Sequence, residues 1–250
     1  MTITEKEWQN YIGKLGKLSR TVADKIKAYI EKNGLEDPKL LIEYAYALVT
    51  KYGEGAAALS AQMYDVVAQL EGRYLEAAAM APTASYGDIA RTVYGTLKDS
   101  QNAEEIAGAV SRWVKSAGAD TTLQNAARDG AEFAWIPSGD TCAFCIMLAG
   151  NGWQRVSKQS LKNGHAEHIH SNCDCQYAIR FDGRSTVAGY NPYEYQSMYR
   201  HAEGRTPEQK LNSMRRQFYA EDREHINEQK RDAYEKRQEL ESSQAEEKKV

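Results

Sequence analysis

The residues with the clearest chemical potential in this 250-residue chain are its four cysteines, which all lie within 34 residues of one another. Cys142 and Cys145 have the spacing C-x2-C, and after 24 residues the pattern H-x2-C-x-C follows, formed by His170, Cys173 and Cys175. Zn²⁺ in a structural site takes four nitrogen or sulfur ligands in a tetrahedron, and a tight turn at C-x2-C directs both sulfurs at one ion. The spacing therefore predicts a structural zinc site.

The second half of this pattern has one donor more than a four-ligand site needs. His170 and Cys173 can converge from one turn and are the favoured completion, whereas ligation by four cysteines would leave His170 outside and include Cys175. Either set closes the site and leaves no position for a reacting water, which favours a structural role. Two other interpretations of the cysteines stay open, a pair of disulfides and buried thiols without a metal.

A catalytic interpretation is also open, because His165, Glu167 and His168 lie between the two halves of the pattern. Histidine and carboxylate could hold a second, open metal and activate water there, as in a nuclease or another hydrolase. His165 and His168 are equally compatible with exposed loop positions.

The charge balance excludes one class of function. The chain has 32 Lys and Arg against 35 Asp and Glu, a formal net charge of −3. A generally basic nucleic-acid coat is thereby ruled out, although a local basic patch is not. No apolar run approaches the roughly 18–20 residues of a membrane span, and the start of the chain has no apolar signal segment. We therefore expect a protein that stays in the compartment where it is made, without a membrane partner.

Apolar residues spaced by three and four predict a helical body over residues 1–135. Asn33-Gly34 and Gly53 are interpreted as helix ends, Asp37-Pro38 as a helix start, and Pro82 as the end of a long alanine-rich helix. The expected helices are 19–33, 38–53, 56–81, 87–98, one beginning near 103, and 121–134.

The rest of the chain changes in character at Pro137. Residues 136–183 are predicted to be a small α+β module that the metal stabilises, with short strands at 153–157 and 176–181. Residues 184–250 are expected to be a loop up to 204 and then a charged helix, either solvated or docked on a partner. The predicted fold class is mainly α: a helical body, a zinc-stapled module and a charged C-terminal helix.

At the cysteine pattern the chain resembles the Mu F-type minor head proteins (head morphogenesis proteins) of tailed bacteriophages. Their C-terminal module has the pattern D-x-x-C-x-x-C-x-x-L-x-G and, after a spacer, H-P-N-C-R-C running into a strand. The resemblance covers about residues 85–183 and departs from the family at Ser171 for the usual proline, Asp174 for the usual arginine and Ala149 for the usual aspartate. The leading aspartate is also shifted and lies immediately before Thr141. The matching residues are Cys142, Cys145, Leu148, Gly150, His170, Asn172, Cys173 and Cys175.

The resemblance implies a non-enzymatic minor capsid protein, located in the phage head and, during assembly, in the host cytoplasm. Its implied partners are the portal protein and the major capsid protein, and a contact with the packaged DNA is left open. A zinc adaptor with no phage connection is the remaining alternative.

Overall fold

The computed structural model describes residues 3–138, 141–156 and 175–221. The chain folds into two compact units, residues 1–196 and 197–250, and the boundary between them falls inside α7. The domain boundaries predicted from the sequence, at 135/136 and 183/184, separate parts that are expected to fold independently, and they stay a prediction. The helices and strands are α1 (Glu5–Asn33), α2 (Pro38–Leu70), α3 (Tyr86–Asp99), α4 (Ala103–Asp129), β1 (Glu132–Ile136), α5 (Ala143–Ala149), β2 (Gln154–Arg155), β3 (Gln176–Arg180), α7 (Pro192–His201) and α8 (Pro207–Glu221).

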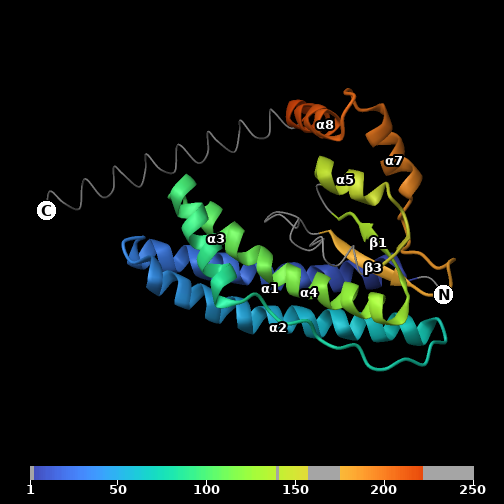
Figure 1. Cartoon of the computed structure of the whole chain (residues 1–250), viewed down its shortest axis with the longest axis horizontal. Coiled ribbons are helices and arrows are strands. Elements are labelled where there is room, and N and C mark those ends of the chain that lie inside the picture. The colour runs from blue at the N-terminus through green and yellow to red at the C-terminus, as the bar shows by residue number, and fades with distance from the viewer. Residues whose placement is uncertain (1–2, 139–140, 157–174, 222–250) are drawn as a thin grey trace, which may run out of the picture. The chain divides into compact units, whose positions relative to one another are not determined.

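The first unit is a bundle of long helices with a small sheet, so the mainly helical fold class is confirmed for the described residues. Helices α1, α2 and α4 pack along one another, and the sheet packs on α4 and α2 (Figure 1). The sheet is antiparallel with the strand order β2-β1-β3. Tyr177 and Ala178 of β3 belong to the same buried core as the helices, so sheet and bundle share one apolar interior.

Local sequence signals explain where the helices begin. Thr4 and Glu7 form a reciprocal capping box at the start of α1, and Ser85 and Asp88 form another at the start of α3. The predicted start of α2 is confirmed, since the Asp37 side chain accepts hydrogen bonds from the first backbone amides and proline follows it. These contacts satisfy amide groups that a helix start leaves without an internal partner.

Helix α2 corrects two of the expected boundaries. It runs unbroken through Gly53, which was expected to end a helix. A Cβ at Gly53 would lie 2.9 Å from Thr83 Cγ2. The glycine therefore allows the Thr83 side chain to pack closely against α2 and does not end the helix. The helix expected over 56–81 is also wrong beyond Leu70, where α2 ends.

The connection from 73 to 85 is neither helix nor strand, and side chains of α2 and α4 hold its backbone. Asp65 Oδ1 accepts a hydrogen bond from the Ala78 amide, and Asn125 both accepts from the Ala79 amide and donates to the Ala79 carbonyl. These hydrogen bonds come from residues distant in sequence, which explains why local helix propensity failed to predict the segment.

The other corrections concern short elements. The helix expected over 121–134 is not a separate helix, because α4 runs unbroken from Ala103 to Asp129. It is also wrong beyond Asp129, because Gly130, with φ of +69°, ends α4 and the chain turns into β1. The loop expected over 184–204 contains α7. The strand expected at 176–181 is confirmed as β3, and the one expected at 153–157 is confirmed only as the short β2. A helix after Arg205 is confirmed as α8, and the rest of the charged tail lies outside the described residues.

Candidate functional site

The described cysteines lie at one end of the sheet, which we call the cysteine end. Cys142 is the N-cap residue of α5, and Cys145 lies in the helix and is buried. Cys175 is also buried and directly precedes β3, whose first residue, Gln176, pairs with Ile136, the last residue of β1. Because α5 packs on β1, the fold brings Cys142 and Cys145 to the same end of β1 as Cys175.

The predicted metal site is only partly within the described residues. His170 and Cys173 lie outside them, as do His165, Glu167 and His168 of the catalytic alternative. Among the described residues no group of three or more His, Cys, Asp or Glu side chains is arranged to hold a metal ion. The zinc site and its ligand set therefore stay predictions. What favours them is that cysteine thiolates are typical ligands of structural zinc.

The opposite end of the sheet gathers charged residues that sequence reasoning had not singled out, and we call it the arginine end. In the antiparallel register Glu132 of β1 lies directly across from Arg155 of β2 and from Arg180 of β3. Residues directly opposite one another project from the same face of a sheet, so Glu132 has an arginine on each neighbouring strand, and Arg180 is the one that pairs with it. Arg180 Nε donates to Glu132 Oε2 at 2.6 Å, and the Arg180 guanidinium lies 4.5 Å from the centre of the Trp153 ring.

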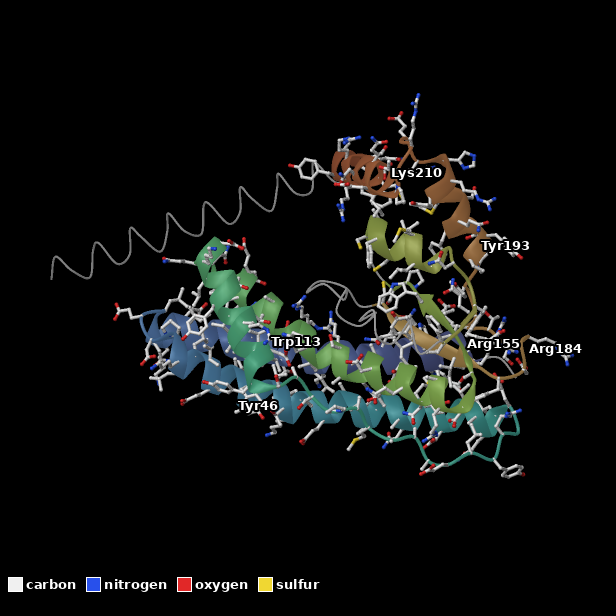
Figure 2. The ribbon with its side chains drawn as sticks, in the orientation of Figure 1. Tyr46, Trp113, Arg155, Arg184, Tyr193 and Lys210 are labelled. Carbon is white, nitrogen blue, oxygen red and sulfur yellow. The ribbon has the colours of Figure 1, made fainter. Side chains whose placement is uncertain are left out.

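A tight turn after β3 adds a third arginine to this end. Asp182 Oδ1 accepts hydrogen bonds from the amides of Arg184 and Ser185 at 2.8 and 2.7 Å, and Gly183 takes the positive φ of +67° that the turn needs. Arg155 and Arg184 are exposed, and Figure 2 shows both on the same side of the ribbon. The sequence offered one indication of this end: side chains alternate between the two faces along β3, and this alternation fixes the face on which Arg180 lies.

Comparison with known protein families assigns the chain to one of them. Residues 2–202 match the family model of the VG15 protein. The chain belongs to the VG15 protein family. This is a family of viral proteins, and the match covers the helical bundle, the sheet and the cysteine pattern together. No curated protein and no solved structure matches the chain.

The family assignment supports the viral part of the expectations drawn from the sequence. It does not distinguish a Mu F-type minor head protein from other viral proteins. In the part of the chain that the structure describes, none of the helices combines the length and apolarity that crossing a membrane requires.

The turn at the arginine end makes stability depend on pH. Hydrogen bonds from the Ser185 amide first, and then from the Arg184 amide and the Ser185 hydroxyl, lower the pKa of Asp182 to about 2. The pKa of an unfolded aspartate is about 3.9. A depressed folded-state pKa stabilises the protein fully above the unfolded value, and this contribution is lost as the pH falls through about 2. We expect Asp182→Asn to be less stable than the wild type at pH 6 and equally stable near pH 2, measured by urea denaturation.

The control for this prediction is Asp99→Asn, which removes an exposed carboxylate at the end of α3. It should show no comparable convergence with the wild type at low pH. A constant difference between Asp182→Asn and the wild type from pH 6 to pH 2 would mean that the carboxylate does not hold this turn.

Proposed function

We propose that this protein is a minor structural component of a tailed-bacteriophage head, acting without enzymatic activity as an adaptor at the portal or the major capsid protein. The observation that carries the proposal is the family match over residues 2–202, which places the helical bundle and the cysteine pattern in one viral protein family. The resemblance of that pattern to the Mu F-type module supports the finer assignment. The strand that this module has after its last cysteine corresponds to β3.

A structural zinc ion is part of the proposal. Cys142 and Cys145 would supply two ligands, with the others from Cys173, Cys175 and His170. Burial of Cys145 and Cys175 suits thiolates that a metal neutralises. Bound zinc would add a rigid connection between α5 and the start of β3.

The proposed partner surface lies on α2 and α3, where tyrosines are exposed. Tyr46 and Tyr86 are 36% and 45% exposed and pack edge to face with ring centres 5.5 Å apart. Tyr94 of α3 is 49% exposed. Tyrosine offers a large contact area with little side-chain entropy to lose, and it is enriched among the residues that dominate binding energy. Figure 2 shows where Tyr46 lies.

The test is binding to the portal protein of the same virus, measured by sedimentation of the full-length chain with assembled portal rings. The wild type should co-sediment, and the double variant Tyr46→Ser/Tyr86→Ser should bind at least about tenfold more weakly, as expected for residues worth more than about 1.4 kcal/mol. Tyr193→Ser, which removes an exposed tyrosine outside this surface, is the matched control and should bind as the wild type does. Absence of wild-type binding to both portal and capsid protein would contradict the adaptor role.

The same preparation tests the absence of enzymatic activity. Incubated with supercoiled plasmid and Mg²⁺, Mn²⁺ or Zn²⁺, the protein should leave the plasmid intact. Nicking that disappears in His165→Ala and His168→Ala would favour the hydrolase alternative instead.

A further inference from the structure

The arginine end holds more cations than its ion pairs use. Besides Arg155, Arg180 and Arg184, the connection after α2 contributes Arg73, whose guanidinium lies 5.5 Å from the centre of the Phe181 ring directly after β3. The end of α4 contributes Arg128, which precedes β1. The five cations come from five different segments that the fold brings to one end of the sheet.

Two of these arginines are engaged within the fold. Arg180 is paired with Glu132, and Arg128 is paired with Asp129 at 2.7 Å and also donates to backbone carbonyls of the connection after α2. Both side chains are at least two-thirds buried. Their charges are largely compensated locally, so they position neighbouring elements and are not available to a partner.

The remaining three, Arg73, Arg155 and Arg184, are exposed, and among the described residues none of them forms an ion pair within 4 Å. Arg73 is still close enough to Asp129 to contribute to the lowered pKa of that carboxyl. Of the nearby carboxylates, Glu132 and Asp129 are paired with Arg180 and Arg128, and two others are held by backbone donors. Glu71 Oε2 accepts hydrogen bonds from the amides of Phe181 and Asp182, and the Asp182 carboxylate closes the turn before Arg184. These hydrogen bonds hold the two carboxylates against the backbone, while the three arginine side chains are exposed.

We propose that Arg73, Arg155 and Arg184 form a binding surface for the phosphate backbone of duplex DNA. A guanidinium group presents a planar fork of donors that matches phosphate oxygens, which a lysine ammonium does not. The three come from the connection after α2, from β2 and from the turn after β3, so the partner must offer several anions over a wide area at once. Duplex DNA does so as a rigid polyanion with one charge per about 1.7 Å of its axis, whereas an acidic peptide would have to lose conformational freedom first.

This inference goes beyond the adaptor role and does not depend on it. The contacts are to phosphate, so the binding is independent of base sequence. Three contacts give a weak interaction that salt opposes strongly, because each neutralised phosphate releases condensed counterions.

The experiment measures fluorescence anisotropy of a labelled 25-base-pair duplex of arbitrary sequence with the full-length protein. With three contacts the logarithm of Kd should rise with the logarithm of salt concentration at a slope of about 2.7, so binding should weaken about 40-fold between 50 and 200 mM NaCl. The triple variant Arg73→Gln/Arg155→Gln/Arg184→Gln should lose at least tenfold in affinity at 50 mM NaCl. Its circular dichroism should match the wild type, since all three side chains are exposed.

The matched control is Arg200→Gln/Arg205→Gln/Arg215→Gln, which removes the same charge from exposed positions on and between α7 and α8. It should keep its affinity within about twofold. An equal loss in both triple variants would overturn the assignment in favour of non-specific charge, and wild-type affinity in the first variant would overturn it outright. Binding to poly-glutamate but not to the duplex would show that the surface recognises an acidic protein.

Discussion

Replacing Gly118 with alanine is expected to lower the free energy of unfolding by about 1–3 kcal/mol, because α1, α2 and α4 meet at this residue. A Cβ at Gly118 would lie 2.8 Å from Ser60 Oγ and 3.7 Å from Leu15 Cδ2. The Ser60 hydroxyl is buried and hydrogen-bonds the Tyr11 hydroxyl at 2.8 Å. The added methyl group must push the serine away from this partner, and a buried hydroxyl that loses its hydrogen bond is costly.

Gly13→Ala is the matched control, since it makes the same change in the exposed part of α1. Nothing lies within 4 Å of a Cβ at Gly13, so the substitution should stabilise the protein by about 0.5–1 kcal/mol through the lower backbone entropy of the unfolded chain. Urea denaturation of both variants gives the comparison. Equal effects at the two positions would contradict the close packing of the three helices at Gly118.

Replacing Cys145 with serine is expected to reduce bound zinc from about one ion per chain to below about 0.1 and to lower the melting temperature strongly. A structural zinc ion contributes its binding free energy to folding, and a serine hydroxyl is a poor substitute for a thiolate ligand. Elemental analysis of protein purified without chelator measures the first effect, and differential scanning calorimetry the second.

A chelator separates loss of metal from loss of packing, since Cys145 is also a core residue. EDTA should lower the melting temperature of the wild type and leave Cys145→Ser unchanged. If EDTA has no effect on the wild type while the variant is still destabilised, Cys145 contributes only packing. Equal zinc losses in Cys173→Ser and Cys175→Ser would indicate four cysteine ligands with His170 outside the site.

Local signals in the sequence predicted the long helices and β3, but not β1, α5 or α7, and not all of the helix ends. The caps at Asp37 and Gly34 and the alternation in β3 depend on neighbouring residues, and these were predicted correctly. The end of α2 at Leu70 was missed because residues 73–85 are held by Asp65 and Asn125, whose proximity arises only after α2 and α4 pack.

The two candidate sites differ in the same way, because one depends on residues close in sequence and the other only on the fold. The cysteine pattern could be found from spacing, because metal ligands recur at short, characteristic intervals. The arginine end could not, because Arg73, Arg155 and Arg184 are far apart in sequence and converge through strand register and helix ends. A net charge of −3 gave no indication of a local cationic surface.

The measurement that most directly tests the central claim is quantitative mass spectrometry of purified virus particles from the virus that encodes this chain. Peptides of the chain should be present in particles that have packaged DNA, at a constant and small ratio to the portal protein. A chain that is expressed during infection but absent from purified heads, while portal and capsid peptides are abundant, would contradict the assignment as a minor head protein.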